Sequence, residues 1–206
     1  QFVDELPDGV QVGLVTFDTS ARLLVAPTDD KAQVLSALDN LSVGPGTATA
    51  DGISAALAAI QGVPKGDSGK PTPAAIVLMS DGTPTVAAND ADPMAAAEAA
   101  SAEAGKAGIP VDTIAFGTTE GTVRVQGRDV SVPVDTAAME QIAQQSGGKS
   151  FAAETSDQLG SIYDALTHDI AYETKTQEVT ALFVGIALAL AVAAAIAALL
   201  WTQRIV

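Results

Sequence analysis

Six consecutive apolar residues, Ala74-Ala75-Ile76-Val77-Leu78-Met79, are followed directly by Ser80-Asp81-Gly82. A strand that is apolar throughout, instead of alternating, is typical of a parallel sheet whose two faces are covered by helices. The run therefore predicts an α/β fold. It also places the Asp81 carboxylate where a buried strand ends, which is where α/β proteins hold their functional residues.

Strand and helix patterns alternate along the first 170 residues. Strands are expected at 10–17, 22–25, 74–79, 110–116, 123–125, 130–132 and 150–151. Helices are expected at 28–41, from about residue 50, at 93–106, at 136–146 and at 156–170. Thr28 is the expected N-cap of the first of these helices, and Asp92 of the third. This alternation predicts a doubly wound, mostly parallel sheet.

The segment from Val179 to Trp201 contains no charged residue. A helix of this length would extend about 35 Å, which exceeds the ~30 Å hydrocarbon layer of a bilayer. A buried central helix is the alternative, but a segment that is apolar on all sides at the chain end fits that poorly. The sequence therefore predicts a transmembrane helix. Gly185 and Ala189 give it a small-residue face on which a partner helix in the membrane could pack.

The domain organisation follows from these patterns. We expect a folded domain at 1–170, a juxtamembrane tether at 171–178, the transmembrane helix at 179–201 and a short tail at 202–206. The segment from Gln1 to Leu6 has the pattern of the last turn of an amphipathic helix, and no initiator methionine precedes it. The sequence is therefore interpreted as truncated at its N-terminus.

The charge of the chain excludes some partners. All 25 acidic residues precede Val179, and the net charge is −15. Nucleic acid and anionic lipid are poor partners for so acidic a domain. The chain has no cysteine, which excludes disulfides and thiol chemistry.

Enzyme motifs are incomplete. The sequence Gly52-Ile53-Ser54-Ala55-Ala56 lacks the second glycine of a nucleophile elbow. The only histidine, His168, lies late in a predicted helix, where a structural role beside the helix C-terminus is sufficient explanation. Gly44-Pro45-Gly46 continues into neither a dinucleotide-binding nor a phosphate-binding loop. The chain is therefore not expected to be an enzyme.

A candidate metal site combines Asp81 with a second segment. Gly44-Pro45-Gly46-Thr47-Ala48-Thr49 is a loop of small residues that opens a helix, and it places the Thr47 hydroxyl where it could share one pocket with Asp81. Hydroxyl and carboxylate oxygens are ligands for hard divalent cations. The alternatives are that Asp81-Gly82 is only a turn and that Thr47 only caps a helix.

These features together resemble a von Willebrand factor A domain over about residues 1–170. The resemblance rests on the strand order, on Gly46-Thr47-Ala48-Thr49 before a helix, on Ser80-Asp81-Gly82 and on the final hairpin and helix pair. Phe116-Gly117-Thr118, the approach Val132-Pro133-Val134-Asp135 and the membrane helix are most similar to the BatA-type membrane proteins of bacteria.

The resemblance implies a metal-ion-dependent adhesion site made from an Asp-x-Ser-x-Ser motif, a threonine and a later aspartate. Thr47 takes the threonine position and Asp81 the aspartate position, and Thr49 is expected to support the site. The first motif is missing, because Asp18-Thr19-Ser20-Ala21-Arg22 has arginine in place of the second serine and follows the wrong strand. In the family that motif ends the first strand, which would lie upstream of Gln1.

The resemblance also implies a function. The expected protein is anchored in a bacterial cell membrane with its domain outside the cytoplasm, and it binds a protein partner whose acidic side chain completes the coordination of Mg²⁺ or Mn²⁺. Two alternatives remain, a metal-independent scaffold in a membrane assembly and, third, an Asp-based phosphotransfer enzyme. Lys175 and Arg204 flank the membrane helix, so the distribution of basic residues does not decide its orientation.

The missing motif generates a prediction for this 206-residue chain. Because Thr47 and Asp81 provide too few oxygen ligands for a tight magnesium site, isothermal titration with MgCl₂ or MnCl₂ is expected to detect weak binding or none. Submicromolar affinity in this chain would contradict the assignment.

Overall fold

The computed structural model describes residues 2–42, 44–64, 72–118, 122–125, 128–131 and 134–171. Residues 1–171 form one compact unit. The strands are β1 (Val12–Phe17), β2 (Ala21–Thr28), β3 (Ile76–Ser80), β4 (Val111–Phe116), β5 (Thr122–Val125), β6 (Arg128–Ser131) and β7 (Ser150–Ala153). The helices are α1 (Phe2–Glu5), α2 (Lys31–Asp39), α3 (Thr49–Gln61), α4 (Pro93–Lys106), α5 (Thr136–Ser146) and α6 (Ser156–Ala171), with a short 3₁₀ turn, η1 (Ala88–Asp90).

The central sheet is parallel, as the apolar run before Asp81 predicts. Its strand order is β3-β4-β7, with Ile76 opposite Val111 and Thr113 opposite Ser150. The hairpin β1-β2 is antiparallel, and so is the small hairpin β5-β6.

The strands do not form the single sheet that the sequence predicts, and this affects the site. Among the described residues, β1 pairs only with β2, and β3 pairs only with β4. The hairpin and the parallel sheet are therefore separate sheets, and β1 and β3 are each an edge strand of their own sheet.

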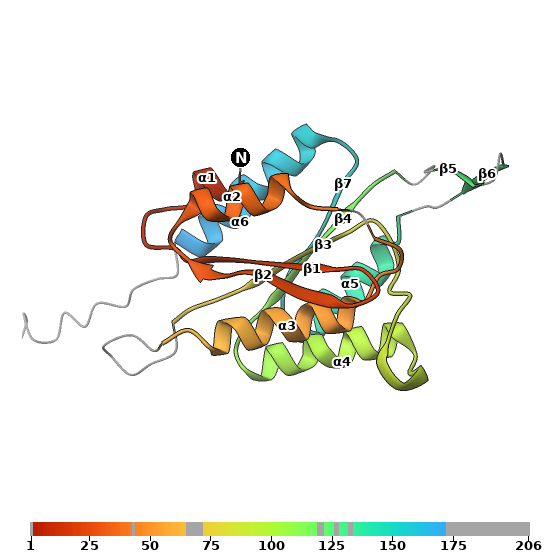
Figure 1. Cartoon of the computed structure of the whole chain (residues 1–206), viewed down its shortest axis with the longest axis horizontal. Helices are drawn as coiled ribbons and strands as arrows, with labels where there is room; N and C mark the ends of the chain where they lie inside the picture. Colours follow the sequence, from red (N-terminus) through yellow and green to blue (C-terminus); the bar gives the residue numbers. More distant parts are fainter. Residues whose placement is uncertain are drawn as a thin grey trace, which may run out of the picture. The chain divides into compact units, whose positions relative to one another are not determined.

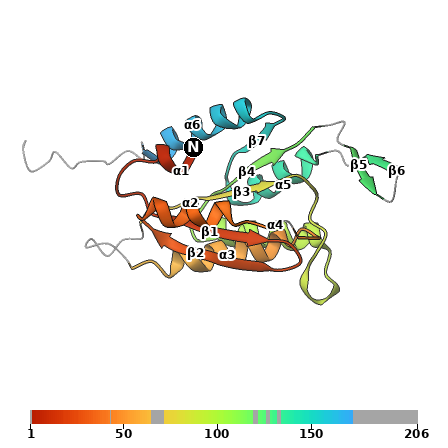
Figure 2. The same ribbon diagram turned by 45° about the horizontal axis from the view of Figure 1, so that its top comes forward.

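Helices cover both sides of the strands (Figure 1). On one side α3 packs against β1, β2 and β3, while α4 packs against both α3 and α5. On the other side α2 lies on the β1-β2 hairpin and α1 contacts both α2 and α6. Figure 2 shows α3 and α6 on opposite sides of the strands. The predicted two-sided covering of the sheet is confirmed.

The larger hydrophobic core joins the two sheets through α3. Ile53 is fully buried and belongs to the same cluster as Ile76 and Leu78 of β3, and Phe17 of β1 packs against that cluster. Removing apolar surface from water is the dominant favourable term in folding. The core beneath α3 therefore connects β1 to β3 although their backbones are not paired.

A second, smaller core lies under α2. Val3 of α1, Val25 of β2 and Val34 of α2 are buried together. The predicted last turn of a helix at the start of the chain is confirmed as α1, which docks here, and its Phe2 ring stacks on Tyr163 of α6 with 4.7 Å between the ring centroids.

Helix caps test the local predictions. The Asp92 side chain accepts a hydrogen bond from the Ala95 N–H at 2.8 Å, and Pro93 follows it as the first residue of α4, as predicted. Thr28 is not the N-cap of α2, because β2 continues through Thr28. Asp30 caps this helix instead, accepting from the Gln33 N–H at 3.2 Å.

The predicted transmembrane helix falls on residues that the structure does not describe. Within the described ranges no helix is both long and apolar enough to cross a membrane. The predicted transmembrane helix at 179–201 and the predicted tail at 202–206 lie outside those ranges. So does the predicted tether at 171–178, except for Ala171, which is the last residue of α6.

The contact between α4 and α5 generates a prediction. A Cβ atom on Gly105 would lie 2.7 Å from Cα of Ser146, so alanine cannot fit without moving a helix. Gly105→Ala should therefore lower the free energy of unfolding by about 1–3 kcal/mol, although alanine has the higher helix propensity. Urea denaturation measures this change.

Gly62→Ala is the matched control. Gly62 has φ −75° and a Cβ there would lie 3.4 Å from the nearest atom, which is ordinary contact. This variant is expected to unfold close to the parent midpoint. A stabilised Gly105→Ala protein would show that α4 and α5 do not approach this closely.

Candidate functional site: a rim cavity between two sheets

A cavity of about 630 Å³ lies where β1 and β3 end; it is called the rim cavity below. Both residues of the predicted metal site, Thr47 and Asp81, line it. Its other lining residues are Val15, Thr16, Phe17, Asp18, Arg22, Leu24, Asn40, Leu41, Ser42, Gly44, Gly46, Met79, Ser80 and Phe116. The structure thus brings two segments that are distant in sequence to one hollow.

Thr47 is held by a reciprocal pair of hydrogen bonds. Its N–H donates to Oγ1 of Thr85 at 2.9 Å, and the Thr85 N–H donates to the Thr47 carbonyl at 3.1 Å. Thr85 belongs to the loop that follows Asp81, so the loop before α3 is fastened to the loop after β3. The side chain of Thr47 is half-buried beside this junction.

Asp81 follows β3 in a turn that its neighbour closes. The Ser80 hydroxyl donates to the Gly82 carbonyl at 3.1 Å and accepts from the Gly82 N–H at 3.3 Å. Farther along, the Thr83 hydroxyl donates to Asp135 at 2.9 Å, and the same Asp135 caps α5. The Asp81 side chain is exposed, which leaves its carboxylate accessible from solvent.

Asp18 also lies at the rim, although its segment does not match the Asp-x-Ser-x-Ser motif and was not predicted as part of the site. It follows β1 as Asp81 follows β3, and its carbonyl accepts from the Ala48 N–H at 2.7 Å. Hydrogen bonds from the Ser20 N–H and then from the Thr19 hydroxyl lower the pKa of its carboxyl. Asp18 comes directly after a predicted strand, and the same position after a strand is what identified Asp81 as a candidate site residue.

Glycine is required where the loop before α3 meets Asp18. A Cβ on Gly44 would lie 2.7 Å from the Asp18 Cβ, which is closer than side chains pack. Gly46 has φ +89°, in the left-handed region that favours glycine. The small residues at these positions therefore let the Thr47 loop lie directly on the Asp18 turn.

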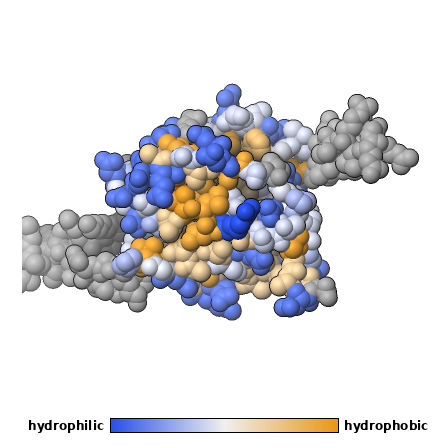
Figure 3. Space-filling model, in the orientation of Figure 1, coloured by the Kyte–Doolittle hydropathy of each residue, from blue (hydrophilic) through white to orange (hydrophobic). Residues whose placement is uncertain are grey.

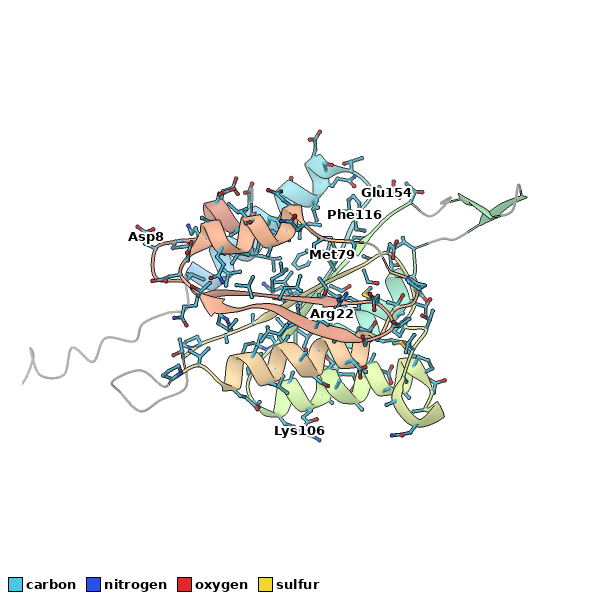
Figure 4. The ribbon with its side chains drawn as sticks, viewed as in Figure 1. Asp8, Arg22, Met79, Lys106, Phe116 and Glu154 are labelled. Atoms are coloured by element: carbon cyan, nitrogen blue, oxygen red, sulfur yellow. The ribbon has the colours of Figure 1, made fainter. Side chains whose placement is uncertain are left out.

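Apolar side chains form one wall of the rim cavity. Leu24, Leu41 and Met79 line it and are 43%, 45% and 39% exposed, respectively. Figure 3 shows an apolar area on this face. In Figure 4, Arg22, Met79 and Phe116 lie near one another, projecting from β2, β3 and β4. The Arg22 guanidinium is 3.7 Å from the Asp18 carboxylate.

A second cavity, of about 140 Å³, lies on the α3 side of the same strands and is called the inter-sheet cavity. Gly13 and Val15 of β1 line it together with residues 75–78, at the start of β3. Asp18 and Asp81, which directly follow β1 and β3, both line the rim cavity, so the two strands end at the same place. The two strands therefore run in the same direction. Their open edges face each other, with one cavity on each side.

The side chains of Thr47 and Asp81 are of the type that binds a hard cation, but two side chains are too few to hold one tightly. Carboxylate and hydroxyl oxygens suit Mg²⁺ or Mn²⁺, and Asp81 and Thr47 offer one of each. Among the described residues, however, no three acidic, histidine or cysteine side chains are grouped as metal ligands. Further ligands would have to come from another segment.

The whole chain matches curated relatives in sequence. A protein of Mycobacterium marinum described as a UPF0353 protein is 40% identical over 207 residues, which cover all of this chain and 62% of that relative. The chain thus spans less than two thirds of its relative's length.

Solved structures share the fold. BatB from Bacteroides thetaiotaomicron superposes with a TM-score of 0.67 at 22% identity, covering 85% of this chain and 84% of that one. A mussel byssus protein, proximal thread matrix protein 1, whose structure has a zinc-occupied MIDAS motif, superposes with a TM-score of 0.55 at 22% identity, covering 81% of this chain and 37% of that one. The model of the von Willebrand factor type A domain matches residues 1–165, and the chain belongs to that family.

Proposed function

We propose that this domain binds a protein partner through a divalent cation held at the rim cavity. Thr47 and Asp81 supply two of the cation's oxygen ligands, and an acidic side chain of the partner completes the coordination. Mg²⁺ and Mn²⁺ are the ions to expect, because both accept oxygen ligands and retain exchangeable waters. The chain then acts as an interaction module and not as an enzyme.

One observation carries this proposal. Thr47 and Asp81 line the same cavity, and the Thr47–Thr85 hydrogen bonds fix the loops from which they project. The exposed Asp81 side chain is accessible to an ion from solvent. The Asp18 carboxylate lines the same hollow, but the Arg22 guanidinium 3.7 Å away offsets its charge, so the proposal rests on Thr47 and Asp81.

The remaining protein ligands come, in this proposal, from an Asp-x-Ser-x-Ser segment outside the 206 residues. The family implies such a segment at the end of a strand. The facing open edges of β1 and β3 give that strand a place, and its carboxyl end would reach the rim beside Asp18 and Asp81.

The cellular setting is part of the proposal. The apolar segment Val179–Trp201 anchors the domain in a bacterial cell membrane, with 171–178 as tether, 202–206 as tail and the domain at 1–170 outside the cytoplasm. A partner helix packs on Gly185 and Ala189 within the bilayer.

A second function is favoured by a separate observation. Leu24, Leu41 and Met79 expose apolar surface around the rim cavity, and exposed apolar patches mark interaction sites. A scaffold that docks its partner on this surface would need no metal. Phosphotransfer at Asp81 ranks third, because no Asp-x-Asp follows it.

Partner capture separates the first two functions. The complete protein, carrying a tag, is used to capture its partner from a membrane extract with Mg²⁺, with chelator, or as the Asp81→Ala variant. We expect both chelator and Asp81→Ala to remove the captured protein, because each removes the metal bridge. Quantitative mass spectrometry of the eluates measures the loss.

Glu103→Ala is the matched control, since it removes an exposed carboxylate on α4, which packs on the opposite side of the strands. It should capture normally. Capture that survives both chelator and Asp81→Ala would establish the scaffold and refute the bridge, and ³²P incorporation that Asp81→Ala abolishes would establish the enzyme.

A further inference from the structure

Asp135 uses its two carboxylate oxygens for two different contacts. One oxygen accepts from the Ala138 N–H at 2.9 Å and caps α5, whereas the other accepts from the Thr83 hydroxyl at 2.9 Å. Thr83 lies 52 positions earlier in the sequence, shortly after Asp81. The side chain that begins α5 is therefore also bonded to the loop that carries a predicted metal ligand.

The other two aspartates that cap described helices make only the first kind of contact. Asp30 accepts from the Gln33 N–H at the start of α2, and Asp92 accepts from the Ala95 N–H at the start of α4. In the described part of the chain neither carboxylate accepts a hydrogen bond from a distant segment. Capping a helix needs one acceptor oxygen, so the bond from Thr83 is additional to capping.

The Asp81 carboxylate depends on its backbone for its position. Its side chain is exposed, and among the described residues it makes no hydrogen bond or ion pair. At Gly82 a Cβ would meet open space, so no packed side chain restrains the loop there. The Ser80–Gly82 hydrogen bonds shape the turn locally. The next contact along the loop, from Thr83 to Asp135, is the one that joins it to another part of the domain.

Helix α5 is a firm support for this contact. The Ser101 hydroxyl of α4 donates to the Ile142 carbonyl. The Thr113 hydroxyl of β4 donates to the Met139 carbonyl at 3.0 Å. All four residues are buried, and fully satisfied buried hydrogen bonds rigidify the packing around them. A loop bonded to the cap of α5 is therefore held by the core of the domain.

We propose that Asp135 is a positioning residue for the rim site: through the Thr83 hydroxyl it fixes the backbone that presents Asp81 to a cation. This inference rests on the proposed function, because Asp81 is the ligand that is positioned. The Thr47–Thr85 hydrogen bonds hold the same loop to the start of α3, so the loop is fixed at two points. Binding an ion then does not have to order the loop first, which favours affinity.

Thr83→Val tests the contact without altering the cap, because it removes an exposed hydroxyl and nearly keeps the shape of threonine. In the metal-free 206-residue chain, NMR order parameters of the amides of residues 81–83 should fall from about 0.85, typical of ordered backbone, toward about 0.6. The amides of α5 should stay ordered. Tm should remain within about 2 °C of the parent, because exposed substitutions change stability little.

Asp135→Ser tests the same contact from the other side. Serine caps helices about as well as aspartate, but it is too short to reach Thr83 as well, so residues 81–83 should loosen as in Thr83→Val. Asp135→Asn should behave like the parent, because its amide oxygen can cap and its amide nitrogen can donate to the Thr83 hydroxyl. Asp92→Ser is the matched control, since it makes the same exchange at the cap of α4 and should leave residues 81–83 ordered.

Several results would overturn the positioning role. Equal order parameters at residues 81–83 in the parent, Thr83→Val and Asp135→Ser would show that the contact does not hold the loop. Equal loosening by Asp92→Ser would show that any lost cap has this effect. Residues 81–83 that are already loose in the parent would show that the contact does not form in solution.

Isothermal titration of the complete protein with MnCl₂ separates this inference from the proposed function. Thr83→Val and Asp135→Ser should each weaken Mn²⁺ binding by about 10-fold, the lower end of the effect of removing groups that support metal ligands. Asp135→Asn and Asp92→Ser should bind as the parent does. Parent-like affinity in Thr83→Val and Asp135→Ser would overturn the positioning role and leave the metal bridge intact. A parent that binds no Mn²⁺ would refute the bridge, while the metal-free order parameters would still decide whether Asp135 fixes the Asp81 loop.

Discussion

The reciprocal hydrogen bonds between Thr47 and Thr85 are the interaction on which the candidate site depends. They join residues 38 positions apart, and they set the loop before α3 against the loop after β3. Without them the Thr47 hydroxyl and the Asp81 carboxylate would each lie on an independently moving loop. Gly44, which packs directly on Asp18, and the Ala48 N–H, which bonds to the Asp18 carbonyl, add β1 to the same junction. The rim of the structure is thus a meeting point of three segments, fixed mainly by backbone groups and not by the side chains that would bind an ion.

The structure is well packed on one side of this junction and open on the other. Beneath α3 a continuous core connects β1 to β3, but the backbones of these strands do not pair and the space between them opens into two cavities. Among the described residues, β1 and β3 each have an unpaired edge, and the Thr49 hydroxyl is buried without a hydrogen-bond partner. An unpaired strand edge is also a known route to aggregation, so this feature bears on the behaviour of the 206-residue chain in solution.

Local signals in the sequence predicted most of the fold and part of the site, whereas long-range contacts could not be predicted. The bounds of α5 and the Asp92 cap of α4 follow from helix periodicity and capping chemistry, which depend on neighbouring residues only. Thr28 was wrong as a cap because pairing with β1 extends β2 through it, a tertiary effect. Thr47 and Asp81 were found because loops and strand ends have recognisable compositions. Thr85 was not predicted, because its importance arises from its contact with Thr47, which no local pattern encodes. Asp18 was set aside because its segment does not match the family motif, although its position after a strand was a usable local signal.

The central claim is that Thr47 and Asp81 hold one ion together. Paramagnetic broadening of amide NMR signals by Mn²⁺, added in substoichiometric amounts to the complete protein, tests it most directly, because the effect falls steeply with distance from the ion. The account predicts that the signals of Thr47 and Asp81 broaden first and together, and that Mg²⁺ in excess restores them. Broadening centred elsewhere, such as on the acidic turn at Asp29 and Asp30, with Thr47 and Asp81 unaffected, would contradict it.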